Sequence, residues 1–193
     1  MDYLAQILSN PLVTIDGNVL SSRYVSDIRD SYVSKFGYAI PNEKALQEIA
    51  LYGPIVEYGA GTGYWAYRLR KIGVEVIPFD VKPPNEGNNQ YKFRYQWVDD
   101  INYPQLVANF AYTHSLMLCW PCYGKKWATD VVQEYRVSGG KYFIYIGEPK
   151  GGCTGTDGLF NEIKKYWSIC TIVNIPTWYW LHDKLIIYSR MEA

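Results

Sequence analysis

The sequence predicts an α/β protein built on a doubly wound, mostly parallel sheet of seven strands. Short apolar runs alternate with helix-like segments from residue 54 onwards, which is typical of parallel strands with helices on both faces. The first run is followed by a glycine-rich turn at Gly59, Gly61 and Gly63, where the backbone can approach a bound molecule closely. The last two runs are joined by a loop without a helix, which predicts an antiparallel C-terminal hairpin.

The N-terminal residues 1–52 are expected to form a helical extension in front of the sheet. Ser21 or Ser22 is expected to serve as the N-cap of a first helix, and Gly37 ends that helix. Pro41 begins a second helix. A Gly-Pro pair then breaks the chain ahead of the first strand.

The strands of the core follow from the apolar runs, and the helices from the segments between them. The expected strands are 54–58, 74–79, 93–98, 115–119, 141–146, 169–175 and 185–190. The expected helices are 64–72, 104–111, 125–137 and 158–167. Trp127, Val131 and Tyr135 recur at the spacing of one helix face, so their helix should cover the sheet. Because no linker or repeat interrupts the pattern, the chain is expected to be one domain with its core at 53–193.

Composition narrows the class of protein. The chain has 193 residues, 48% of them hydrophobic, and no net charge, so it lacks the basic footprint of a nucleic-acid-binding protein. The N-terminus does not resemble a secretory signal, and no apolar run approaches a membrane span. Four cysteines at uneven spacing do not form a disulfide framework. These features predict an intracellular, cytoplasmic protein with no membrane partner, and the charge does not favour nucleic acid as a partner.

The glycine-rich turn narrows the choice of ligand. A dinucleotide fingerprint requires glycine or alanine at the position that Tyr64 occupies. A phosphate-binding loop requires a Gly-Lys-Ser/Thr sequence, which does not follow the turn. The turn therefore indicates a different cofactor.

The turn resembles motif I of class I S-adenosylmethionine (SAM) dependent methyltransferases, with Glu57, Gly59, Gly61 and Gly63 at the matching positions. In that family the turn lies against the methionine part of SAM, and an acid at the end of the second strand accepts hydrogen bonds from the ribose hydroxyls. Asp80 supplies such an acid about 20 residues further on. The resemblance implies a Rossmann-like methyltransferase core with SAM as its cofactor and no metal.

Three more residues are expected beside the cofactor by the same resemblance. Ala60 lies within the turn, Asp99 follows the third expected strand at the adenine position, and Cys119 ends the fourth.

The loop after the fourth strand is expected to face the methyl acceptor. It is similar to the D/N/S-P-P-Y/F loop of enzymes that methylate amino groups, and this chain keeps Pro121 and Tyr123. Trp120 replaces the polar head residue and Cys122 replaces the second proline, so methylation of a nucleobase amino group does not carry over. Trp120 and Tyr123 are instead expected to stack on the acceptor as catalytic and substrate-binding residues, with Pro121 beside them.

A base and two further acceptor contacts are expected from other segments. Methyl transfer from a sulfonium is a direct displacement, which requires alignment more than a strong catalyst. Glu148 ends the fifth strand at the carboxyl edge and is the expected base. Tyr38 and His182 are expected to contact the acceptor, which is left open as a small molecule or an exposed side chain.

Two other functions stay open at this point. Cys119 and Cys122 form a C-x-x-C at a strand-helix junction, as in thiol-disulfide oxidoreductases. Alternatively, the altered acceptor loop indicates a catalytically inactive module that binds SAM or a protein partner.

Overall fold

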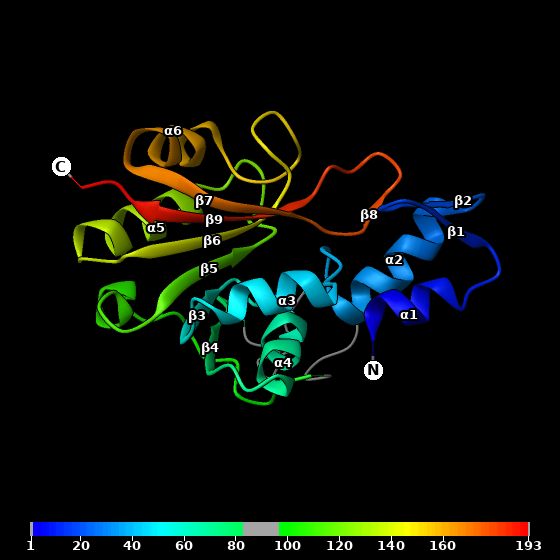
Figure 1. Ribbon diagram of the computed structural model, residues 1–193, viewed down its shortest axis with the longest axis horizontal. Helices are drawn as coiled ribbons and strands as arrows, with labels where there is room; N and C mark the ends of the chain where they lie inside the picture. Colours follow the sequence, from blue (N-terminus) through cyan, green and yellow to red (C-terminus); the bar gives the residue numbers. More distant parts are fainter. Residues whose placement is uncertain (1, 83–96, 193) are drawn as a thin grey trace.

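The computed structural model describes residues 2–82 and 97–192, and its centre is a sheet of six strands (Figure 1). The order across this sheet is β4-β3-β5-β6-β9-β7. Strands β3 to β6 run parallel, whereas β9 pairs antiparallel with both β6 and β7. The strands are β3 (Ile55–Tyr58), β4 (Val76–Phe79), β5 (Ser115–Cys119), β6 (Tyr142–Gly147), β7 (Trp167–Asn174) and β9 (Lys184–Arg190).

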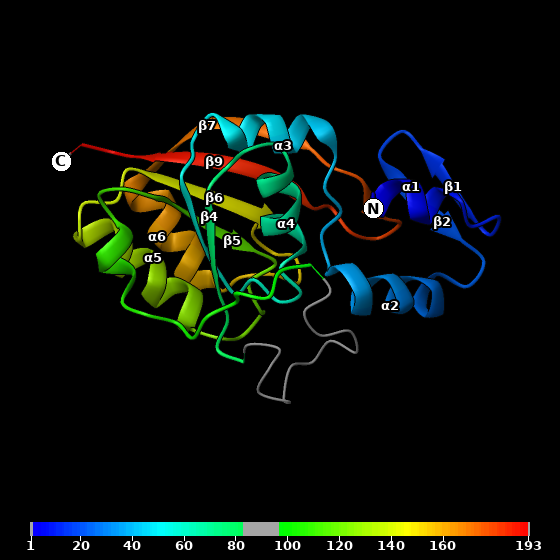
Figure 2. The same ribbon diagram turned by 90° about the horizontal axis from the view of Figure 1, so that it is seen from below.

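Helices cover both faces of the sheet, as expected for a doubly wound fold (Figures 1 and 2). One face packs against α3 (Glu43–Ala50) and α4 (Tyr64–Lys71), and its buried layer includes Leu46, Leu69 and Met117. The other face packs against α5 (Trp127–Val137) and α6 (Asp157–Tyr166). The strands alternate their side chains between these two layers.

The sheet has six strands among the described residues rather than the expected seven. The missing strand, 93–98, lies mostly outside the described residues, and Trp97 and Val98 do not form a strand. Asn102 makes a single parallel bridge to Phe79 at that edge, beside β4. The expected helix 104–111 is only a short 3-10 helix, η2 (Val107–Phe110).

The N-terminal extension is not wholly helical, which corrects the expectation for residues 1–52. It contains α1 (Tyr3–Leu8), a hairpin of β1 (Val13–Asp16) and β2 (Val19–Ser22), and α2 (Val25–Phe36). Strand β2 also pairs in parallel with β8 (Thr177–Trp178), so a second sheet joins the two ends of the chain. Leu20 and Trp178 are fully buried in the cluster that this pairing creates.

The expected cap of the first helix is also wrong. Ser21 and Ser22 belong to β2, and the N-cap of α2 is Tyr24, which makes no side-chain hydrogen bond. Gly37 ends α2 as expected. The N-terminal unit of α1, β1, β2 and α2 lies beyond the carboxyl ends of the parallel strands, whereas α3 lies along the sheet, as Figure 2 shows.

Candidate functional site

The carboxyl ends of β3, β4 and β5 meet at the wall of one cavity of about 760 Å³. This volume lies within the range of small-molecule and cofactor sites. Six of the residues expected from the sequence line it, namely Tyr38, Gly59, Asp80, Cys119, Trp120 and Tyr123. Parallel strands place their carboxyl ends at one edge, so residues far apart in the chain converge here.

The glycine turn and Asp80 hold each other in place. Asp80 Oδ2 accepts a hydrogen bond from the Gly61 N–H at 2.9 Å, and Oδ1 accepts one from the Lys82 N–H at 3.0 Å. Burial raises the pKa of Asp80, and these hydrogen bonds oppose that shift. Gly61 has a φ of 58°, in the left-handed region that favours glycine. The carboxylate is therefore fixed in the cavity wall, and no hydrogen bond from another described residue occupies its remaining lone pairs.

Two glycines of the turn are required by close neighbours. Gly59 has a φ of 76°, and an added Cβ would lie 3.0 Å from the indole ring of Trp127, which also lines the cavity. At Gly63 an added Cβ would lie 2.2 Å from Val98 Cγ2. Gly63 thus serves packing at the start of α4, while Gly59 and Trp127 shape the cavity. Ala60 is buried and does not line the cavity.

Glu57 is a buried carboxyl group directly behind the turn. Burial raises its pKa to about 8, and the nearby Asp80 adds to the shift, so Glu57 is largely protonated at neutral pH. Its Oε2 is buried and has no hydrogen-bond partner among the described residues. A buried polar atom without a partner is costly, and a polar group of a bound ligand or a water would satisfy it. Glu57 is not among the residues that line the cavity, so Asp80 is the acid in the wall that fits a cofactor with hydroxyl groups.

Asp99 lies apart from this group. It is exposed, and it is not among the residues that line the cavity. Its neighbour Asp100 forms a two-pronged ion pair with Arg70, with both distances at 2.8 Å.

The cavity is also lined by a stacked aromatic pair, Tyr38 and Trp120. The rings of Tyr38 and Trp120 lie 4.4 Å apart and are parallel within 5°. Trp120 has a φ of 54°, which is uncommon for a residue other than glycine and marks a conformation that the surroundings impose. Its indole N–H donates to Asp183 Oδ1 at 2.8 Å. Burial raises the pKa of Asp183 to about 7, and the bond from Trp120 opposes this shift.

Glu148 accepts hydrogen bonds from two loops and is not among the residues that line the cavity. Its Oε2 accepts from the Cys153 N–H at 2.7 Å, and its Oε1 accepts from the His182 N–H at 3.0 Å. Burial opposes ionisation, but these hydrogen bonds outweigh it and hold the pKa of Glu148 below its ordinary value. The imidazole of His182 is exposed, with Nδ1 3.5 Å from Glu148 Oε1.

The rest of the acceptor loop is anchored by its backbone. Pro121 is buried, and its carbonyl accepts a hydrogen bond from the Gly155 N–H at 2.9 Å. Tyr123 is 70% exposed at the rim of the cavity. Burial raises the pKa of the Cys119 thiol well above its ordinary value, so this thiol is not an activated nucleophile.

Sequence reasoning missed several residues of the cavity wall. They are Tyr58, Lys82, Gln105, Lys125, Trp127 and Cys153. Trp127 had a signal, since it belongs to the apolar face of α5 at the end nearest the glycine turn. The others lie in no motif, and only the folded chain brings them together.

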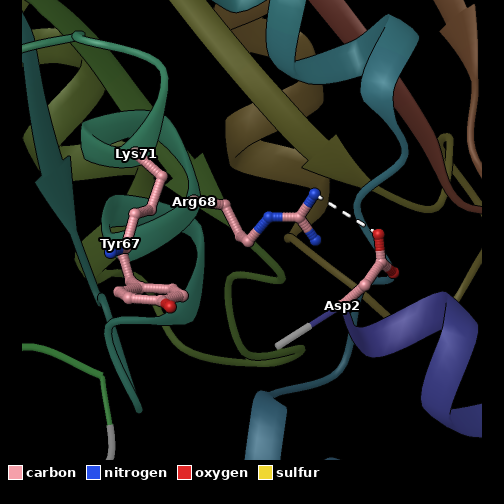
Figure 3. Close-up of a pocket in the computed structure, with 4 residues that line it drawn as sticks. All are labelled: Asp2, Tyr67, Arg68 and Lys71. Atoms are coloured by element: carbon pink, nitrogen blue, oxygen red, sulfur yellow. Dashed lines mark ion pairs between the residues drawn. The ribbon is translucent and has the colours of Figure 1, made fainter.

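A second hollow of the molecule is a shallow surface feature. It is lined by Asp2, Tyr67, Arg68 and Lys71, and the Arg68 guanidinium points towards the Asp2 carboxylate at 3.5 Å (Figure 3). None of the residues expected to act in binding or catalysis lines it. Within residues 2–82 and 97–192, no cluster of side chains could hold a metal ion, and no described helix is long and apolar enough to cross a membrane.

Comparison with known proteins identifies the fold. No protein-family model matches the sequence, and no curated protein does. Magnesium protoporphyrin IX methyltransferase from Synechocystis, solved with bound SAM, matches with a TM-score of 0.51 at 13% identity, covering 98% of this chain and 90% of that one. The chain has the fold of class I methyltransferases.

Two further solved structures match the chain over most of its length. The same enzyme with bound S-adenosylhomocysteine (SAH) has a TM-score of 0.50 at 12% identity, covering 98% of this chain and 93% of that one. A protein from Pyrococcus horikoshii has a TM-score of 0.50 at 12% identity, covering 77% of this chain and 89% of that one. At such identities the shared property is the fold, with its parallel sheet and C-terminal antiparallel strands.

Proposed function

We propose that this protein is a SAM-dependent methyltransferase that acts on a small molecule or an exposed side chain. The observation that carries the proposal is Asp80, fixed by the Gly61 N–H in the wall of a cavity that the Tyr38 and Trp120 stack also lines. A cofactor end and an acceptor end in one cavity are what a direct transfer between two bound molecules requires.

The residues of the turn would hold the cofactor. Asp80 would accept hydrogen bonds from the ribose hydroxyls, and the turn from Gly59 to Gly63 would lie against the methionine part. Trp127, over Gly59, would exclude water from one side.

Bound SAM would supply a methyl group attached to a sulfonium sulfur. The nucleophile of the acceptor would take this methyl group and release its proton to solvent, and the sulfur would leave as a neutral thioether. The protein's contribution is alignment and exclusion of water. Trp120 and Tyr38 would fix the acceptor's plane, and Tyr123 would close over it from the rim. Glu148 would act as a positioning residue, since both its oxygens already accept backbone hydrogen bonds.

Calorimetric titration with SAH tests the proposal. Binding of SAH by the folded wild-type chain with one site per chain is the expected result, followed by release of SAH from SAM when a suitable acceptor is added. Failure of the folded protein to bind SAM or SAH would refute the proposal. Binding without turnover across a broad acceptor screen would favour an inactive module.

The thiol-disulfide alternative has less support. A reactive cysteine in such a motif has a lowered pKa, whereas burial, Glu57 and Asp183 all raise the pKa of the Cys119 thiol. Nothing in that function would use Asp80 or the glycine turn.

A further inference from the structure

A mostly buried arginine flanks the aromatic pair at the acceptor end. The guanidinium carbon of Arg29, in α2, lies 5.5 Å from the ring centroid of Tyr38 and 5.7 Å from that of Trp120. The two centroids are themselves only 4.4 Å apart. Both distances are in the range of cation–π contacts, so the guanidinium interacts with both rings of the pair.

Among the described residues Arg29 has no short ion pair, although the buried Asp183 lies within its electrostatic range. The side chain of Arg29 is only 17% exposed, yet its Nε is buried without a hydrogen-bond partner among the described residues. Its ion pair with Asp30 is long, at 3.8 Å, and that carboxylate is 75% exposed. A desolvated cation in this state is stabilised if an anion is supplied.

The guanidinium is near the cavity at its acceptor end. Tyr38 and Trp120 both line the cavity, as do Cys122 and Cys153. The hydroxyl of Tyr38 lies within electrostatic range of Arg29 and of both cysteines. Arg29 therefore lies near the part of the cavity wall that Tyr38, Cys122 and Cys153 line.

The charges at the aromatic end combine Arg29 with a buried acid. Among the described residues that line the cavity, two acids, Asp80 and Glu134, balance two bases, Lys82 and Lys125. Asp183 accepts the indole N–H of Trp120, and the positive charge of Arg29 lowers its pKa, so this cation and this carboxyl group interact.

We propose that Arg29 binds a carboxylate of the methyl acceptor, so that the acceptor is a planar molecule with an anionic group. Its ring would lie against the Tyr38 and Trp120 stack and its carboxylate would bond to the guanidinium in the two-pronged geometry that arginine favours. The inference rests on the proposed function for the identity of the bound molecule as the acceptor.

Matched probes test this subsite without turnover. The full chain, saturated with SAH and labelled with ¹⁵N-tryptophan, is titrated with 2-naphthoate and with 2-naphthamide, which share a ring but differ in charge. The NMR signal of the Trp120 indole N–H is assigned with Trp120→Phe and reports occupancy. Naphthoate is expected to bind at least about tenfold more tightly, as for a hydrogen bond to a charged group.

Variants assign the preference to one side chain. Arg29→Gln should bring the two affinities together, and Arg29→Lys should retain part of the preference because the charge remains. Arg23→Gln removes a charge from an exposed residue just before α2 and should leave the preference intact. Circular dichroism and an unchanged SAH affinity confirm that each variant is folded.

Two results overturn the proposal. Equal effects of naphthoate and naphthamide on wild-type protein, or no effect of either, would show that no carboxylate subsite exists. A preference that survives Arg29→Gln would place the anion on another residue. Either result with SAH still bound leaves the proposed function standing, whereas loss of SAH binding by the wild type refutes that function.

Discussion

Replacing Asp80 by Asn is the most direct perturbation of the cofactor end. Oδ2 holds the glycine turn through the Gly61 N–H, and Oδ1 accepts from the N–H of Lys82 in the loop that follows Asp80. Asn keeps one acceptor oxygen, but its NH₂ group would face a backbone N–H at the other position, where two donors cannot pair. The loss of charged hydrogen bonds to a ligand is about 1.5–3 kcal/mol, which corresponds to a roughly 10- to 150-fold weaker affinity for SAH.

Calorimetry of wild-type protein, Asp80→Asn and Asp100→Asn measures this effect. Asp100→Asn is the matched control, because it removes the same charge from an exposed residue whose partner is Arg70. Urea unfolding of each variant separates a loss of affinity from a loss of fold. An SAH affinity of Asp80→Asn within about twofold of the wild type would refute the assignment of Asp80 to the cofactor, since such a change is far below the expected charged hydrogen bond. An equal loss in both variants would point to general electrostatics instead.

Three further variants test the packing and electrostatics of the site by urea unfolding. Gly63→Ala should destabilise the fold by about 2–5 kcal/mol, from the left-handed φ and the contact with Val98, and an unchanged midpoint would contradict that packing. The folded-state pKa of Glu148 is lowered, so the ionised carboxylate stabilises the fold above pH 4.5. This stabilisation is lost as the pH falls through the folded-state pKa. The difference in unfolding free energy between wild type and Glu148→Gln should therefore shrink between pH 6 and pH 3. The pKa of Asp183 is raised from 3.8 to about 7, so ionisation opposes folding, and Asp183→Asn should gain stability relative to wild type as pH rises across that window. A constant difference across the pH range would contradict either pKa assignment.

The core of the fold was predictable because its signals are local. The apolar run 115–119 became β5 with the same bounds, and the C-terminal strands formed the antiparallel pair that the helix-free loop indicated. The hairpin of β1 and β2 was missed because its two strands have four residues each and little apolar pattern. Its partner β8 lies at the other end of the chain, and strand preference depends on such tertiary contacts.

The residues of the site also divide into those that a local sequence signal predicts and those that only the folded chain brings together. Asp80, Gly59 and Trp120 could be found because each directly follows or ends a strand, and the carboxyl ends of parallel strands meet at one edge. Arg29 and Asp183 could not be found, since their relation to Trp120 is made only by packing of distant segments.

The position of the aromatic pair is set by a chain of contacts that begins at Glu148. Its carboxylate fixes the backbone at His182, and the next residue, Asp183, accepts the indole N–H of Trp120. Trp120 in turn stacks on Tyr38, which joins the N-terminal unit to the sheet. An acid at a strand end need not meet the substrate to matter for transfer, because a small displacement of an aligned group is enough to slow a direct displacement. In the proposed transfer the buried carboxylate would therefore act on the acceptor through the ring that it helps to hold. Its ionised form is the one that the two backbone N–H groups select.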